Sequence, residues 1–222
     1  EGLCNVGEGM DEVLIVDRER FRSELSCLVE SQKNLDALSF FKLVHIAYEL
    51  AVYGKCQKEI LFYHIHNPDT YAQLNFMCHA PDSRWIMMVR EPIQSCESWI
   101  KEPYSEGDYV SISNRVYSML YDIDNFIFRK HDSRGIRLED LKIYPEKTIR
   151  ALCKWMGIKE EETLYKMTVQ NKKWWGDPSS PDFGKKGMDP FDQSSINRKV
   201  GTIFTQNDQY ILKTLFYPFR VK

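Results

Sequence analysis

The feature that most limits the fold is an alternation of short apolar runs with segments of helical periodicity. The runs cover residues 59–64, 84–89 and 135–138. Continuous apolar runs of this length are typical of parallel strands that helices cover on both faces. Because a helix is predicted between successive runs, the sequence predicts right-handed βαβ units. We therefore expect an α/β fold with a mostly parallel sheet flanked by helices.

Helices are predicted where apolar periodicity coincides with signals for a helix end. The clearest begins at Pro145 and stops at Gly157, and another ends at Gly54,. The helix that ends at Gly54 covers residues 37–53. The remaining predicted helices cover residues 17–32, 71–79, 111–130 and 206–216, with one more starting at Pro92. Thr205 and Asp208 resemble a capping box before the last of these. Residues 1–10 are predicted to be loop, and residues 168–205 lack periodicity, as a functional loop often does,.

Charge, hydropathy and cysteine usage exclude some classes of protein. The net charge of −2 over 222 residues argues against a non-specific nucleic-acid binder, so an anionic ligand would need a local basic site,. No apolar stretch is long enough for a membrane span. None of the six cysteines belongs to a CxxC pair, and their spacings suit no zinc motif,. We expect them to be reduced and mostly buried, which favours a cytoplasmic location.

The segment Val89-Arg90-Glu91-Pro92, with Ser98 eight residues after Arg90, is the sharpest motif. It places Arg90 at the carboxyl end of a predicted strand, where ligands bind in open α/β sheets. A guanidinium offers phosphate a planar pair of donors, and the start of the next helix also favours an anion. The alternative is an arginine paired with a nearby carboxylate at the end of a strand.

This segment resembles the 3′-phosphate-binding motif of sulfotransferases that use 3′-phosphoadenosine 5′-phosphosulfate (PAPS). Residues 136–142, 145–146 and 152–157 are similar to that family's strand, Glu-Asp-Leu turn and following helix. Residues 195–199 are similar to the late loop that covers the nucleotide. Together the matches extend from about residue 59 to the C-terminus. The resemblance implies a P-loop NTPase-like sulfotransferase fold.

The resemblance also implies roles for single residues. Arg90 and Ser98 would hold the 3′-phosphate, and Arg198 with Lys199 would close over the nucleotide. Solvated surface charges are the alternative for the last two, and the same explanation is preferred for the other basic residues of that loop. The acidic pair at 139–140 is expected to cap backbone groups.

A catalytic base is expected near the end of the first apolar run. His66 matches the family's position best. His64, two residues earlier on the same side of a strand, could contact the transferring sulfuryl group,. Imidazole suits proton transfer near neutral pH. A hydrogen-bonded structural pair is the alternative, and a zinc site lacks a third ligand. Trp99, Trp174 and Trp175 could stack on adenine, although core or loop anchors are more common.

The function expected from these features is transfer of a sulfuryl group from PAPS, as co-substrate, to a hydroxyl or amine of a small-molecule or glycan acceptor, without a metal. One alternative is a catalytically inactive sulfotransferase-like fragment that serves as a binding or interaction module. Another is a P-loop kinase-like phosphotransferase, which would need a Mg²⁺ site.

One domain of residues 1–222 is expected, with a helical segment (1–55), an α/β core (56–160), and a nucleotide-covering loop with a C-terminal helix (161–222). The family begins with a strand and a Gly-containing phosphate loop, which nothing in this sequence resembles. The domain is therefore expected to be N-terminally incomplete.

Overall fold

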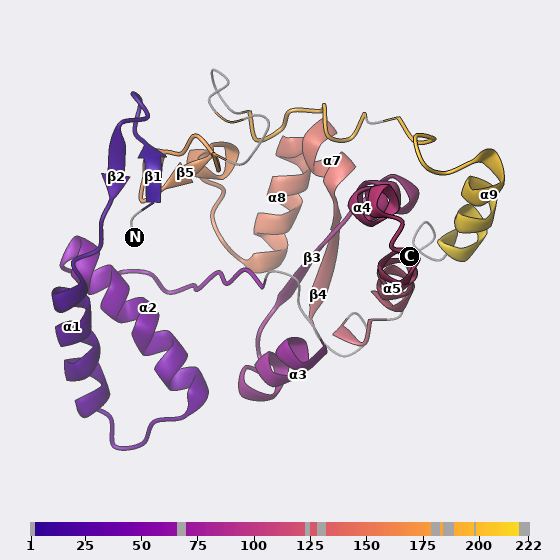
Figure 1. The fold of residues 1–222 in the computed structure, drawn as a ribbon. Coiled ribbons are helices and arrows are strands. Elements are labelled where there is room, and N and C mark those ends of the chain that lie inside the picture. The colour runs from indigo at the N-terminus through magenta and orange to yellow at the C-terminus, as the bar shows by residue number, and fades with distance from the viewer. Residues whose placement is uncertain are drawn as a thin grey trace. The chain divides into compact units, whose positions relative to one another are not determined.

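The computed structural model describes residues 3–65, 70–122, 125–127, 132–178, 183, 189–197 and 199–217. The chain divides into two compact units, and each is described by itself. The first comprises Glu1–Ser83 with Val169–Gly176, and the second comprises Arg84–Thr168 with Asp177–Lys222. The elements of both are labelled in Figure 1. The single domain expected over residues 1–222 stays a prediction.

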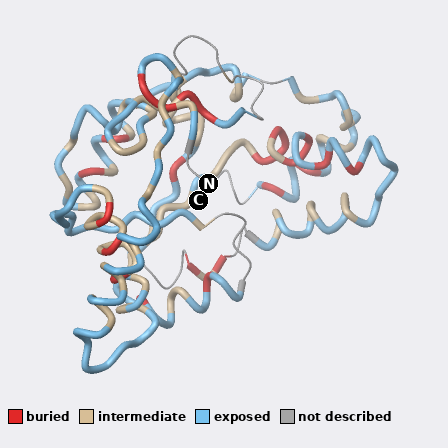
Figure 2. The backbone as a smooth tube through the Cα atoms, turned by 60° about the vertical axis from the view of Figure 1, so that its left-hand side comes forward, coloured by how far each residue is buried: buried red, intermediate tan, exposed pale blue. Residues whose placement is uncertain are grey.

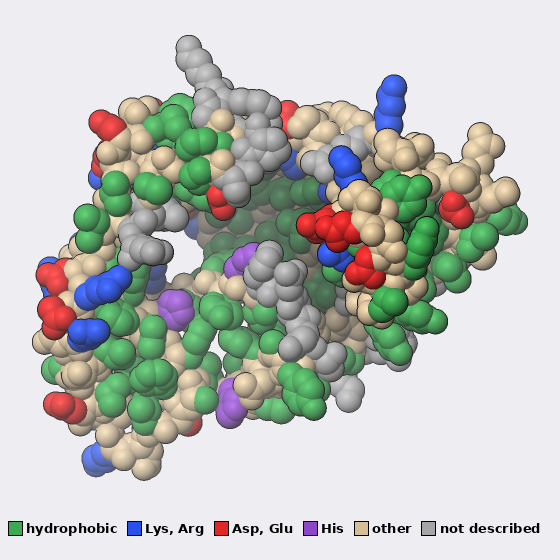
Figure 3. All heavy atoms as spheres, viewed as in Figure 1, with side chains coloured by type: hydrophobic (Ala, Val, Ile, Leu, Met, Phe, Trp, Pro, Cys, Tyr) green, Lys and Arg blue, Asp and Glu red, His purple; other side chains and the backbone are tan. Residues whose placement is uncertain are grey.

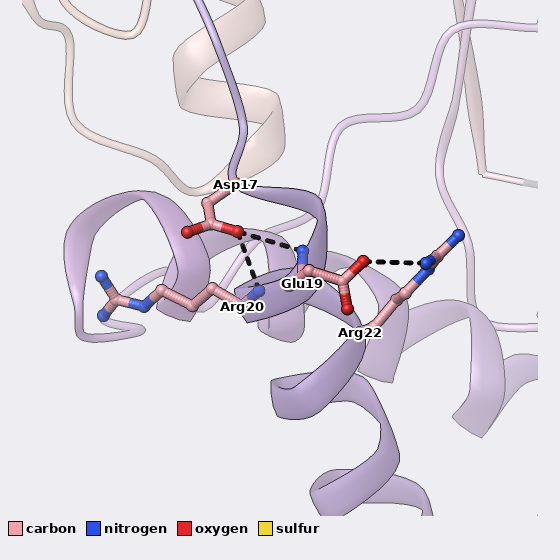
Figure 4. Close-up of polar contacts among 4 residues, drawn as sticks. All are labelled: Asp17, Glu19, Arg20 and Arg22. Atoms are coloured by element: carbon pink, nitrogen blue, oxygen red, sulfur yellow. Dashed lines mark hydrogen bonds and ion pairs between the residues drawn. The ribbon is translucent and has the colours of Figure 1, made fainter.

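Two packed helices, α1 (Arg18–Glu30) and α2 (Ala37–Tyr53), form much of the first unit and confirm the predicted helices. The Asp17 carboxylate caps α1 by accepting hydrogen bonds of 3.0 Å from the backbone N–H groups of Glu19 and Arg20 (Figure 4). Gly54 ends α2 with a φ of 71°, a conformation that glycine adopts without strain,. A third helix, α3 (Thr70–His79), follows.

Short strands also belong to the first unit, and here the sequence prediction was wrong in part. β1 (Leu3–Val6), inside the segment 1–10 expected to be loop, pairs antiparallel with β2 (Glu12–Leu14), which follows that segment. β5 (Thr168–Val169) and β6 (Lys172–Lys173) form a second two-stranded pair. Such strands are too short to show a period of two.

The strand expected over residues 59–64 is wrong. These residues are extended, but the structure assigns them no strand pairing. Ile60 and Phe62 are 55% and 63% exposed, so this is not an interior strand. The ring of Tyr63 instead lies 5.0 Å from that of Phe41 on α2 and 5.7 Å from that of Phe76 on α3. The apolar run thus contributes to an aromatic cluster.

The second unit contains a parallel strand pair, β3 (Trp85–Val89) and β4 (Ser133–Arg137). The pair is in register from Trp85 opposite Ser133 to Val89 opposite Arg137. Every sheet in the described part of the chain has two strands, so the large parallel sheet expected from the sequence is not shown. Met88 on β3 is 53% exposed, so this strand is not buried on both faces as the sequence predicts.

The second unit also contains helices, several of which end where the sequence predicts. They are α4 (Pro92–Glu106), α5 (Tyr109–Asp122), α7 (Leu138–Ile143), α8 (Pro145–Met156), the 3₁₀ helix η1 (Glu162–Tyr165) and α9 (Gln206–Leu215). Gly157 ends α8 with a φ of 72°, and Thr205 and Asp208 form the expected capping box of α9.

The core of the second unit joins α4 to α9. Ile93, Cys96 and Ile100 of α4 pack with Leu212 and Phe216, and side chains of α5 lie against them. Buried residues form short, separate stretches along the backbone (Figure 2). Hydrophobic side chains are correspondingly frequent on the face that Figure 3 shows.

The cysteines differ from the expectation that most are buried. All six are free thiols, but only Cys96 and Cys153 are buried. Cys4, Cys27, Cys56 and Cys78 are exposed. No helix in the described ranges is both long and apolar enough to cross a membrane.

Candidate functional site

Arg90 lies directly after β3, at the edge where the two parallel strands end, and two residues before α4 begins. Its side chain is partly buried. Nη2 donates to Oε1 of Gln94 at 3.1 Å and to the backbone carbonyl of Ser195. Both acceptors are uncharged. The guanidinium therefore joins the strand end, α4 and a loop more than 100 residues away in sequence.

The first turn of α4 is occupied by carboxylates from within the chain. Glu91 is the N-cap, and its side chain accepts a 2.7 Å hydrogen bond from the backbone N–H of Gln94. Oε1 of Glu139, on α7, accepts one of 2.8 Å from the backbone N–H of Glu91. The expected capping role of residue 139 is confirmed. The helix dipole, which the sequence suggested for an external anion, already acts on these two groups.

Polar side chains of α4 hold the late loop, defined here as the described residues of 195–204. Nε2 of Gln94 donates to the carbonyl of Ile196 at 3.1 Å. Glu97 accepts from the backbone N–H of Gly201 at 2.9 Å and of Ile203 at 2.6 Å. Its carboxylate also accepts from the hydroxyl of Thr202 at 2.8 Å.

Glu97 was missed by the sequence reasoning, although a signal was present. It lies four residues after Ile93 and three before Ile100, which are both buried, so it falls on the same side of the helix,. Glu97 itself is 5% exposed. A charged residue on an apolar helical stripe indicates a buried partner, because an unpaired charge there would be costly.

The electrostatics of this helix follow from burial and hydrogen bonding. Burial alone would raise the pKa of Glu97, but the hydrogen bonds from Gly201, Ile203 and Thr202 bring that pKa below its ordinary value,. Burial, together with the neighbouring charge of Glu97, raises the pKa of Cys96 to about 11. Cys96 is therefore a protonated core thiol rather than a nucleophile at neutral pH.

Two other residues predicted to bind the nucleotide lie on α4 and in the late loop. Ser98 is exposed on α4, directly after Glu97 and one turn after Gln94. Lys199 is exposed in the late loop, between the points where Gln94 and Glu97 hold it. Arg198 lies outside the described residues. The structure thus attaches Arg90 and the loop that carries Lys199 to the same helix, while phosphate binding stays a prediction.

The predicted histidines belong to the first unit. His64 is exposed in the extended segment before α3, and His66 lies outside the described residues. Within the described ranges, no group of three His, Cys, Asp or Glu side chains could hold a metal ion.

The structure shows contacts for all three tryptophans. Nε1 of Trp175 donates to the carbonyl of Gly7 at 2.7 Å, and Trp174 forms a β-bridge with Val6. Trp99 lies on α4, and the guanidinium of Arg115, on α5, lies 5.7 Å from the centre of its ring. Trp174 and Trp175 contact β1 and the turn after it. These contacts favour the anchoring interpretation over adenine stacking for both residues.

Comparisons with known proteins add little. No protein-family model matches the sequence, and no curated protein matches it. A solved structure described as a sulfotransferase domain from the curacin biosynthetic pathway matches with 18% sequence identity and a TM-score of 0.46. The match covers 90% of this chain and 81% of that one. At this TM-score the likeness carries no argument about fold or function.

Proposed function

We propose that this chain is a sulfotransferase that moves a sulfuryl group from PAPS to a hydroxyl or amine acceptor. The observation that carries the proposal is Arg90 at the carboxyl edge of a parallel strand pair, where the start of α4 and the late loop meet it. Ligands of α/β proteins gather at this edge. The proposal includes a P-loop-like sulfotransferase fold.

The proposed chemistry is an in-line displacement that needs positioning rather than a metal. The Arg90 guanidinium and the Ser98 hydroxyl would donate to the 3′-phosphate, and Lys199 and Arg198 would neutralise charge from the late loop. The acceptor oxygen or nitrogen would form a bond to sulfur as the bond from sulfur to the phosphate oxygen breaks. His66 would take the acceptor's proton, and adenosine 3′,5′-bisphosphate would leave.

A second candidate, an interaction module without catalysis, is favoured by one specific observation. The carboxylates of Glu91 and Glu139 lie at the first turn of α4 and accept backbone hydrogen bonds there. These two carboxylates lie close to Arg90 and have the same sign of charge as the nucleotide. They would therefore weaken binding of an anionic nucleotide there. The two candidates differ in whether the nucleotide binds at all.

Binding of adenosine 3′,5′-bisphosphate to the whole chain separates them. At a ligand concentration 100 times its Kd, a single site should stabilise the fold by about 2.7 kcal/mol. For a chain of this size we expect the melting temperature to rise by roughly 5–10 °C. Arg90→Ala should remove the shift.

Arg134→Ala is the matched control. It removes a guanidinium from the same strand pair, three positions before the carboxyl end of β4. Retention of the shift in this variant, and its loss in Arg90→Ala, would support the proposal. No shift in the unsubstituted chain would overturn nucleotide binding and leave the interaction module. An equal loss in both variants would mean that Arg90 is not the binding residue.

A further inference from the structure

Arg90, which precedes α4, and Gln94 and Glu97, which lie on α4, hold the late loop at both of its ends. Arg90 and Gln94 hold the carbonyls of Ser195 and Ile196, at the start of the loop. Glu97 holds the backbone N–H groups of Gly201 and Ile203, at its end. Lys199 lies between these attachments in sequence. Its Cα can be no more than ~8 Å from that of Gly201, because consecutive Cα atoms are 3.8 Å apart.

The attachment at Glu97 is a buried carboxylate enclosed by donors. Two backbone N–H groups and the Thr202 hydroxyl donate to it. Gly201 makes this possible by turning the chain with a φ of 112°, a region that side chains rarely adopt,. The turn lets the N–H groups of residues 201 and 203 point at one side chain.

Packing alone does not explain a charged residue at this position. Val200, Ile203 and Phe204 already lie against the core formed by α4 and α9, so the loop has an apolar attachment of its own. Apolar contacts are not directional, whereas a carboxylate that accepts several N–H bonds fixes the path of the backbone. Glu97 therefore specifies the conformation of the segment that follows Lys199.

We propose that Glu97 is a positioning residue that holds residues 199–203 in the conformation in which Lys199 can reach a phosphate bound beside Arg90 and Ser98. This inference rests on the proposed function. It assigns Glu97 no contact with the nucleotide. Its effect passes through Lys199, and that route distinguishes it from a general contribution to stability.

The test is a double-mutant cycle on the whole chain with adenosine 3′,5′-bisphosphate as the probe. Isothermal titration calorimetry gives the Kd for the unsubstituted chain, Glu97→Gln, Lys199→Ala and the double variant. Glutamine keeps the size of the side chain but offers one acceptor oxygen in place of two. We expect Glu97→Gln to weaken binding about tenfold, as the loss of charge-assisted hydrogen bonds does. Adding Lys199→Ala should then cost less than twofold.

Glu102→Gln is the matched control, since it removes the same charge from the same helix. Glu102 is 77% exposed and lies 3.9 Å from Arg115, so its loss should leave the Kd unchanged. Hydrogen exchange gives a readout that does not need the ligand. The amides of Gly201 and Ile203 should exchange at least tenfold faster in Glu97→Gln than in Glu102→Gln.

The outcomes separate this inference from the proposed function. No binding by the unsubstituted chain would overturn both. Binding that Glu97→Gln leaves unchanged, or additive effects of the Glu97 and Lys199 substitutions, would overturn the inference alone. If Glu97→Gln does not fold, Thr202→Val supplies the same test, because it removes one donor to the carboxylate and leaves the charge in place.

Discussion

At the scale of single residues, the chemistry of the proposed site depends on what Arg90 exchanges when a ligand arrives. Its Nη2 now donates to an amide oxygen and a backbone carbonyl. Hydrogen bonds to a phosphate are about twice as strong as those to neutral acceptors. A phosphate can therefore replace the Ser195 carbonyl at a net gain, provided that the loop finds another donor or water for that group.

The planar pair of donors on Arg90 gives a first prediction. Arg90→Lys keeps the charge but loses the bidentate geometry, so it should weaken binding of adenosine 3′,5′-bisphosphate at least tenfold. Calorimetry at constant ionic strength measures this. A Kd within twofold of the unsubstituted chain would show that Arg90 acts only as a point charge.

Glu97 gives a prediction about pH. The pKa of this carboxyl in the folded chain lies below its ordinary value of 4.5. The ionised group therefore stabilises the folded state above that value, and the contribution is lost as the pH falls through the lower, folded pKa. The melting temperature of the unsubstituted chain should exceed that of Glu97→Gln at pH 7. The difference should shrink below about pH 4.

The comparison with Glu102→Gln controls for the general effect of acid on the chain. Glu102 is mostly exposed, so the melting temperature of this variant should follow that of the unsubstituted chain throughout the titration. A difference between the unsubstituted chain and Glu97→Gln that stays constant from pH 7 to pH 3 would contradict the assignment of ionised Glu97 to the loop.

His66 gives a prediction about turnover. If it accepts the acceptor's proton, His66→Ala should lower kcat by about 10²–10⁴-fold and leave the Kd for adenosine 3′,5′-bisphosphate nearly unchanged. Sulfuryl transfer from PAPS, measured beside calorimetry, checks this, and His79→Ala, which removes an exposed imidazole on α3, is the control. Equal losses of turnover and binding in His66→Ala would mean that the residue is structural.

At the scale of elements, helices could be predicted from the sequence because their ends carry local signals. Gly54, Gly157 and the Thr205–Asp208 pair mark helix ends where the structure has them. Strands could not be predicted as well, because an apolar run does not show which other strand, if any, it pairs with. Residues 84–89 find one in β4, while residues 59–64 do not and join an aromatic cluster instead.

The long-range contacts of the candidate site also could not be predicted from the sequence. Glu139 caps the start of α4 from 48 residues away, and Glu97 binds the late loop from more than 100 residues away. No local pattern encodes such a separation. The local secondary structure around Arg90 could be predicted: Arg90 follows the end of a strand, and a helix begins at Pro92.

Gly201 gives a prediction at this scale, with Gly157 as its control. Both have positive φ, 112° and 72°, so alanine at either position should cost about 1–2 kcal/mol of stability,. Neither position has an atom closer than 3.5 Å to an added Cβ, so the cost is conformational. Only Gly201→Ala should also weaken binding of adenosine 3′,5′-bisphosphate, because it displaces the turn that Glu97 holds. Equal affinities in the two variants would contradict this.

At the scale of the whole molecule, the proposed roles are divided between the two units. Arg90, Ser98 and Lys199 belong to the second unit, whereas His64 and His66 belong to the first. With a net charge of −2, the chain has no general attraction for anions, so under the proposed function the affinity for the nucleotide would come from the local cations of the second unit,.

Hydrogen exchange of the whole chain can locate that affinity. Saturating adenosine 3′,5′-bisphosphate should slow exchange in α4 and in the late loop, because a ligand suppresses the opening of the elements that it joins. The helices α1 and α2, which carry none of the predicted nucleotide-binding residues, should exchange at the same rate with and without the ligand. Repeating the measurement with Arg90→Ala removes the binding step and should abolish the protection. Slower exchange confined to α1 and α2 would place the bound nucleotide in the first unit, and Arg90 could not then be its phosphate ligand.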